Sequence, residues 1–233
     1  IPALITPFRD NKVDFEAFDS LVERQIQAGS GALVPCGTTG ESATLSHDEH
    51  REVVERCVHV TRGRVPIIAG CGSNSTEEAI GLVKFAKKVG ADAALTVCPY
   101  YNRPDQNGLF AHFSAIADAV EMPLVLYNVP SRTSSDILPE TVAKLSRHPN
   151  IIGIKDATGD MARVTQHLDL CEGGFNLLSG DDPSAVGFIA MGGQGCISVT
   201  ANVAPEKMAA IHKACAEGDF AAARQIESEV YQL

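Results

Sequence analysis

Short apolar runs recur along the chain, and longer segments with helical periodicity separate them. The runs are the expected strands, and they cover residues 3–6, 32–34, 66–69, 93–97, 124–127, 151–155, 175–178 and 195–199. Successive runs begin about 27 residues apart, which is the length of one strand, one helix and their loops. Apolar runs with so little alternation indicate parallel strands that are covered by helices.

Helical patterns fill the segments between the runs. Apolar residues return at helical spacing over residues 15–26, and Gly29 follows as a stop signal. Residues 46–49 and 75–78 each match a capping box, so we expect a helix to begin at each. Residues 219–233 begin one more helix.

Eight strand and helix units predict an α/β fold of the (β/α)8 TIM-barrel type over residues 1–218. Eight is the number of parallel strands that closes such a barrel. A doubly wound open sheet is the alternative, but no G-x-G-x-x-G motif follows the first run. The additional helix expected at residues 219–233 is not part of a (β/α)8 barrel.

Composition narrows the classes of function. The chain has 233 residues, of which 45% are hydrophobic and 21% are charged, as in ordinary globular proteins. Nineteen Lys and Arg face twenty-nine Asp and Glu, and this net charge of −10 argues against a nucleic-acid partner. Residues 183–205 carry no charge, but their glycines and polar side chains predict a short helix, a turn and a strand, not a membrane span. Seven cysteines without a C-x-x-C pair indicate reduced thiols and a cytoplasmic protein.

The candidate chemistry lies at the ends of the expected strands, where barrels carry their active sites. Lys155 closes one run, and alternation places it on the same face as Ile151 and Gly153, with the glycine leaving room for the lysine stem. A desolvated lysine amine can attack a carbonyl; a charge at the rim is the alternative interpretation. Tyr127 ends the preceding run, either as a proton shuttle for such an amine or as a core tyrosine.

Three further groups follow expected strands. The loop 37–41 (G-T-T-G-E) offers backbone N–H groups and hydroxyls to a small carboxylate, and Arg132 can bind a second one. The alternative interpretation is that the loop 37–41 and Arg132 are ordinary loop residues without a binding role. The adjacent Asp181 and Asp182 would repel a phosphate, so we do not expect one. His47 and His50 have no third ligand nearby, so no metal site is expected.

Three motifs together resemble the pyruvate-dependent class I aldolase superfamily, which includes the N-acetylneuraminate lyases. They are G-T-T-G-E-S at 37–42, Y-N-V-P-S-R-T at 127–133 and G-I-K-D-A at 153–157. Within this superfamily the chain is most similar to the dihydrodipicolinate synthases of lysine biosynthesis, in register from Pro2 to about residue 233. The resemblance implies a TIM barrel followed by a small helical C-terminal domain, of which residues 219–233 are the start.

The resemblance also implies a reaction without a cofactor. Lys155 would form a Schiff base with pyruvate, and the resulting enamine would attack L-aspartate 4-semialdehyde. Tyr127 would be the central proton shuttle, linked through Thr39 to Tyr101. In the family that last tyrosine crosses a dimer interface, and the expected assembly is a homotetramer built as a dimer of dimers.

Binding roles follow from the same resemblance. Thr38, Thr39 and the backbone near Ile197 would hold pyruvate, and Arg132 would recognise the carboxylate of the semialdehyde. L-Lysine is the expected inhibitor, at an allosteric site formed by Ser42, Ala43, His47, His50, Asn74, Glu78 and Tyr100. Two alternatives remain open: a lyase of sialic acid or 2-keto-3-deoxy sugar acids, and a catalytically silent homologue that only binds keto acids.

Overall fold

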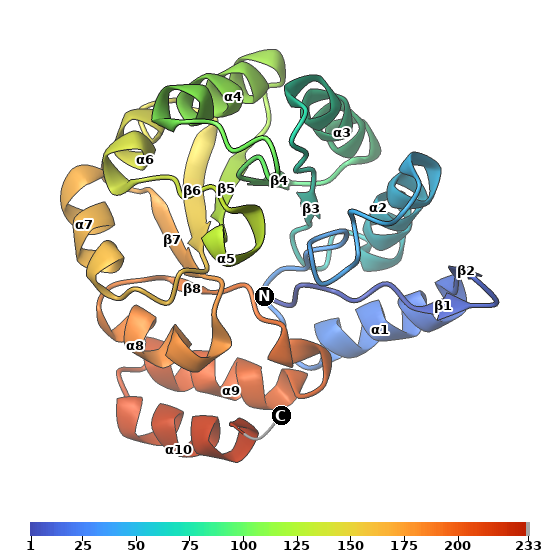
Figure 1. The fold of residues 1–233 in the computed structure, drawn as a ribbon. Helices are drawn as coiled ribbons and strands as arrows, with labels where there is room; N and C mark the ends of the chain where they lie inside the picture. Colours follow the sequence, from blue (N-terminus) through green and yellow to red (C-terminus); the bar gives the residue numbers. More distant parts are fainter. Residues whose placement is uncertain (232–233) are drawn as a thin grey trace.

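The computed structural model describes residues 1–231 and places a curled parallel sheet inside a layer of helices (Figure 1). The six strands of the sheet are β3 (Ile68–Gly70), β4 (Ala93–Val97), β5 (Leu124–Asn128), β6 (Ile151–Asp156), β7 (Asn176–Ser179) and β8 (Gly195–Cys196). They pair in the order of the chain, each parallel to the next. This order lacks the reversal that defines a doubly wound sheet.

Helices follow the strands and lie outside the sheet (Figure 1). The helices are α1 (Phe15–Gln27), α2 (His47–Thr61), α3 (Thr76–Val89), α4 (Gln106–Ala119), α5 (Pro130–Thr133), α6 (Pro139–Leu145), α7 (Ala162–Leu170), α8 (Ala185–Ala190), α9 (Pro205–Ala216) and α10 (Phe220–Val230). Two 3₁₀ turns, η1 (Asp182–Ser184) and η2 (Thr200–Asn202), flank β8 in the chain. The helix expected from residue 219 is α10; residues 232 and 233 lie outside the described residues. A small hairpin of β1 (Phe8–Arg9) and β2 (Lys12–Val13) was not expected from the pattern.

The two capping boxes differ in the structure. At Ser46 the hydroxyl accepts from the N–H of Glu49, and the Glu49 carboxylate accepts from the N–H of Ser46, so the box is complete. At Ser75 only the first half forms. The carboxylate of Glu78 instead accepts a hydrogen bond from Ser73 and pairs with His47. The second box is therefore half correct, because Glu78 is drawn into other contacts.

The first two expected strands are reduced to isolated bridges. Residues 3–6 and 32–34 are short runs bounded by prolines, which donate no ladder hydrogen bond. The parallel bridges pair Pro2 with Ser198, Ala3 with Val34, and Leu33 with Ile67. These contacts connect β8 to β3 through the two short segments.

Two apolar cores lie on the two faces of the sheet. The larger packs the strands against the helices, and the smaller lies inside the curl and includes Tyr127 and Ile197. The register between β5 and β6 shifts by one residue, which places Ile151 in the larger core and Ile152 against the smaller one. The expectation that Ile151 shares a face with Lys155 is therefore wrong, because the bulge breaks the alternation.

The uncharged segment 183–205 forms short elements, as expected. It contains the end of η1, then α8, β8, η2 and the first residue of α9. Within residues 1–231, every helix is too short or too polar to cross a membrane.

Candidate active site

Lys155 and Tyr127 lie side by side at the carboxyl ends of β6 and β5. The two residues are directly paired in the register of these strands. The ammonium nitrogen Nζ of Lys155 lies 4.3 Å from the centroid of the Tyr127 ring. Lys155 is 5% exposed and Tyr127 is 7% exposed, so both are removed from bulk water. The structure thus brings together the two residues that the strand ends singled out.

Burial changes the charge state of this lysine. Desolvation lowers the pKa of Lys155 from 10.5 to about 8, with the charge of Arg132 lowering it further and Cys196 and Asp182 opposing the shift. Roughly a tenth of such amines are neutral at pH 7, far more than for an exposed lysine. A neutral amine is the form that attacks a carbonyl.

The space for the Lys155 stem comes from Gly180, at the end of β7. A Cβ atom at Gly180 would lie 2.7 Å from Cε of Lys155. The expected glycine, Gly153, does something else, because its Cβ would meet the carbonyl oxygen of Asn176 at 2.6 Å. The sequence expectation about Gly153 is therefore wrong: a neighbouring strand, not the same strand, makes the room.

The threonine that faces Tyr127 is Thr38. Burial raises the pKa of the Tyr127 phenol, while a hydrogen bond with Thr38 and the charge of Arg132 act in the opposite direction. The resemblance implies Thr39 in this place, but the hydrogen bond to the phenol comes from Thr38. Tyr101 is 91% exposed and has a φ of 70°, so its side chain projects into solvent from a strained loop position.

The loop 37–42 has few free backbone donors. The N–H groups of Gly40, Glu41 and Ser42 bond to the carbonyls of Gly37 and Thr38 inside the loop. A carboxylate is therefore left with the N–H groups of residues 37–39 and the hydroxyls of the two threonines. Ile197 is fully buried, and its N–H donates to the carbonyl of Ser179 at 2.8 Å. A ligand could use only the carbonyl of Ile197, not this N–H.

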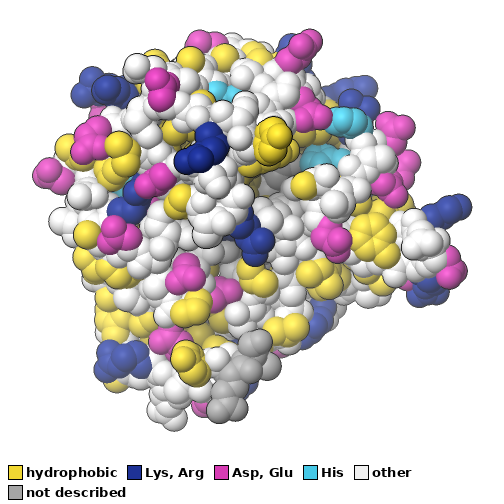
Figure 2. All heavy atoms as spheres, viewed as in Figure 1, with side chains coloured by type: hydrophobic (Ala, Val, Ile, Leu, Met, Phe, Trp, Pro, Cys, Tyr) yellow, Lys and Arg dark blue, Asp and Glu magenta, His cyan; other side chains and the backbone are white. Residues whose placement is uncertain are grey.

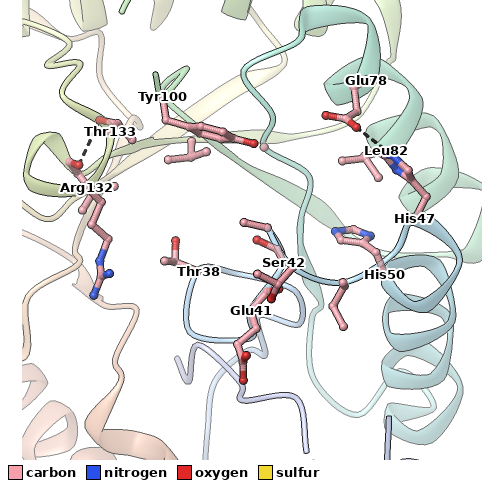
Figure 3. Close-up of a pocket in the computed structure, with 16 residues that line it drawn as sticks. Thr38, Glu41, Ser42, His47, His50, Glu78, Leu82, Tyr100, Arg132 and Thr133 are labelled. Atoms are coloured by element: carbon pink, nitrogen blue, oxygen red, sulfur yellow. Dashed lines mark hydrogen bonds and ion pairs between the residues drawn. The ribbon is translucent and has the colours of Figure 1, made fainter. Parts of the chain in front are cut away.

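A cavity of about 550 Å³ opens beside this site. Thr38 and Arg132 lie at one end of its lining, and His47, His50 and Glu78 lie at the other (Figure 3). Figure 2 shows histidine side chains beside a hollow on the same face, near α2 and α3. One continuous space therefore joins a residue of the expected substrate site to most of the expected regulatory site.

At the regulatory end of the cavity, two of the residues expected to bind a ligand already pair with each other. Nε2 of His47 lies 3.1 Å from a carboxylate oxygen of Glu78. His50 is buried, and its Nδ1 has no hydrogen-bond partner among the described residues. Ser42, Ala43 and Tyr100 also line the cavity. Asn74 is set back from it and donates to the carbonyl of Tyr100 at 3.2 Å.

Asp182 is a residue whose role the sequence analysis missed. Its carboxylate accepts hydrogen bonds from the N–H groups of Val199 and Thr200, both at 2.9 Å, and so orders the segment after β8. Burial raises the pKa of Asp182, but these bonds and one from Ser198 outweigh burial and hold it below its usual value. The sequence used this residue only to argue against phosphate. Its position just after the seventh apolar run was the available signal.

Comparisons with known proteins agree with the motifs. The Dihydrodipicolinate synthetase family matches residues 1–233. The chain is 66% identical to the 4-hydroxy-tetrahydrodipicolinate synthase of Hyphomonas neptunium, over 100% of this chain and 80% of that protein.

Solved structures give the same result. The dihydrodipicolinate synthase from Acinetobacter baumannii complexed with pyruvate is 47% identical with a TM-score of 0.95, over 97% of this chain and 78% of that chain. A structure from Cyanidioschyzon merolae with lysine bound is 37% identical with a TM-score of 0.93, over 97% of this chain and 78% of that chain.

Proposed function

This chain belongs to the dihydrodipicolinate synthetase family, and from that premise we propose that it condenses pyruvate with L-aspartate 4-semialdehyde. The product is 4-hydroxy-tetrahydrodipicolinate, an intermediate of the diaminopimelate route to L-lysine. The observation that carries the proposal is the buried Lys155 amine, with its pKa lowered to about 8, held over the ring of Tyr127.

The first half of the reaction takes place on Lys155. Its neutral amine attacks the C2 carbonyl carbon of pyruvate, and the carbonyl oxygen leaves as water to give an iminium. Loss of a proton from the methyl carbon then gives the enamine. The Tyr127 phenol is placed to carry protons in these steps, with Thr38 as its hydrogen-bond partner. Thr38 and Thr39 hold the pyruvate carboxylate.

The second half joins the semialdehyde. The enamine carbon bonds to the aldehyde carbon, whose oxygen takes up a proton and becomes the hydroxyl. The amino group of the added substrate attacks the iminium carbon and expels the Lys155 amine, which closes the six-membered ring. Arg132, at the same end of the cavity as Thr38, binds the semialdehyde carboxylate through a charge-assisted pair.

The proposal includes an assembly and a complete fold. The bridges at residues 2–3 and 33–34 would close the sheet into a (β/α)8 barrel over residues 1–218, with residue 219 beginning a helical domain. Tyr101, exposed in the single chain, would reach Tyr127 of a second copy across a dimer interface. Two such dimers would make a homotetramer in the cytoplasm.

Feedback inhibition by L-lysine is a second proposal, and the joined cavity favours it. Glu78 can pair with an ammonium group once His47 releases it, and the Tyr100 phenol can donate to a carboxylate. Asn74 can join it if its amide turns from the Tyr100 carbonyl toward the cavity. His50 lines the same end of the cavity as His47 and Glu78. A ligand bound there would act on the site without displacing pyruvate from Lys155.

An activity comparison tests the proposed function. Purified protein is given pyruvate with L-aspartate 4-semialdehyde, and in a second reaction N-acetylneuraminate or a 2-keto-3-deoxy sugar acid. We expect condensation with the semialdehyde and little cleavage of the sugar acids. Preferred cleavage of a sugar acid would assign the chain to the other branch of the superfamily, and no turnover with either would support a silent homologue.

A further inference from the structure

A buried charged network lies directly behind the Lys155 and Tyr127 pair, on the opposite face of the sheet. In the register of β5 and β6, Asn128 is paired with Asp156, one position beyond Tyr127 and Lys155. Because side chains alternate along a strand, this second pair points away from the active site. Asn128 is 0% exposed and Asp156 is 4% exposed.

Arg163, on α7, holds this pair together with a neighbouring loop. Its Nε donates to Oδ2 of Asp156 at 2.9 Å, and its Nη1 lies 3.3 Å from the Asp136 carboxylate. Its third group, Nη2, donates to the carbonyl of Ile137. The arginine is buried and uses its planar fork on three partners from two segments of the chain.

Asn128 is tied to the same loop. Its amide nitrogen donates to Oδ1 of Asp136 at 2.7 Å, and its amide oxygen accepts from the N–H of Ile137 at 3.3 Å. This loop follows α5, which carries Arg132. The ends of β5 and β6 and the segment after α5 are therefore fixed to one arginine.

We propose that Arg163 is a positioning residue for the reaction: it clamps Asp156 and Asp136, and thereby holds Lys155 against Tyr127 at the ends of β6 and β5. The inference rests on the proposed function, because it concerns the geometry of imine formation. The clamp joins three features in one unit: the residue after Lys155, the hydrogen-bond partner of the residue after Tyr127, and the loop that follows Arg132. A role in fold stability alone would not require this combination.

Arg163 is the guanidinium shared by the two carboxylates of the network, Asp156 and Asp136. Burial raises the pKa of Asp156, but the nearby His167 imidazole, bonds from Thr158 and the charge of Arg163 outweigh burial and lower it. Nε2 of His167 lies 3.6 Å from Oδ2 of Asp156. Asp156 is thus a paired carboxylate just beyond Lys155, and loss of Arg163 would leave it unpaired.

Several other groups also face Lys155, and none of them is a hydrogen-bond or ion-pair partner of Arg163. They are Asp182 in η1, Cys196 on β8, Arg132 on α5 and the Tyr127 ring. A Lys155 that is held less tightly is better solvated, and its pKa then moves back up toward the ordinary value because burial is the main cause of the lowering.

The test compares the parent protein with Arg163→Lys, which keeps the charge but cannot bond three partners at once. The rate of pyruvate trapping by borohydride is measured across pH, together with kcat and the KM for pyruvate. We expect a fall of about tenfold or more in kcat and trapping rate, with KM changed less than about twofold, because small misplacements of a reacting group are costly. The midpoint of the trapping profile should move to higher pH.

Arg56→Lys is the matched control, since Arg56 makes a similar two-pronged pair with Asp19 between α2 and α1, away from the site. It should leave trapping and its pH profile unchanged. If Arg163→Lys fails to fold, Asp136→Asn decides, because it removes one charge of the clamp at a half-exposed position without changing shape. It should lower kcat and the trapping rate, by less than Arg163→Lys, with KM little changed.

The inference is overturned if a folded variant of the clamp keeps the parent's pH midpoint and kcat, or loses activity only in proportion to its folded fraction. If the parent itself traps no pyruvate, the proposed function fails instead, and the two failures are distinct.

Discussion

The side chain of Lys155 on β6 lies against Tyr127 on the neighbouring strand β5, and Gly180, just after β7, leaves space for the lysine side chain. The Cβ that Gly180 lacks would lie 2.7 Å from Cε of Lys155 and equally close to Ala157. This packing, together with burial, sets where the amine sits. The three residues come from β6, β5 and the end of β7, so the reactive geometry depends on the register of three neighbouring strands.

Gly180→Ala should therefore impair the enzyme without changing its fold class. The added methyl must push the Lys155 stem away from Tyr127, and we expect the rate of pyruvate trapping to fall about tenfold or more, as displaced reacting groups lose rate. Gly81→Ala is the control, because nothing lies within 4 Å of the Cβ it adds on α3. Equal trapping rates in the two variants would show that Gly180 does not set the lysine's position.

Arg132→Ala should damage use of the semialdehyde far more than formation of the pyruvate imine. A charge-assisted bond lost from the site is worth about 1.5–3 kcal/mol, or roughly ten- to over a hundredfold in kcat/KM for the semialdehyde. Arg147→Ala, at an exposed surface position, serves as the control. A variant that traps pyruvate poorly but uses the semialdehyde normally would move Arg132 to the first substrate.

Lys155→Met should raise stability at neutral pH. The folded-state pKa of about 8 lies below the ordinary 10.5, so the burial cost of the charged lysine is fully present below pH 8 and disappears as the pH rises to about 10.5. The stability advantage of the variant over the parent should shrink by about 3 kcal/mol between pH 7 and about pH 10.5. Denaturant unfolding across this range measures the difference, and a gap that stays constant with pH would contradict the lowered pKa.

L-Lysine should inhibit the parent enzyme partially at saturating pyruvate, and His50→Lys should weaken this inhibition. A lysine at position 50 adds a positive charge to the lining of the cavity, and this charge repels the ammonium group of L-lysine. His59→Lys, exposed on the same helix, should leave inhibition unchanged. The regulatory proposal fails if the parent ignores millimolar L-lysine or if His50→Lys is inhibited equally well.

The sequence predicted most of the sheet because the apolar runs of β4 to β7 are long and nearly continuous. It overestimated the runs at 3–6 and 32–34, where prolines limit the pairing to single bridges. The prediction that Ile151 shares a face with Lys155 was wrong, because nothing in the sequence Ile-Ile indicates a bulge. Strand-end position was enough to find Lys155 and Tyr127.

The remaining site geometry depends on contacts between segments that are distant in the chain. The sequence does not reveal that Gly180 lies against the Lys155 stem, or that Thr38 and not Thr39 faces Tyr127. Asp156 and Arg163 are ordinary charges in the sequence, and only the fold shows that they form one buried clamp. Each of these depends on which strand is the neighbour and on the register between them.

The most direct test of the account is the site of covalent modification by pyruvate. The protein is incubated with pyruvate, reduced with borohydride, digested and mapped by mass spectrometry, in parallel with folded Lys155→Ala. We expect one reduced adduct, on Lys155, that is absent from the variant. An adduct that persists in Lys155→Ala, or that maps to another lysine such as Lys84, would contradict the assignment of Lys155 as the Schiff-base residue.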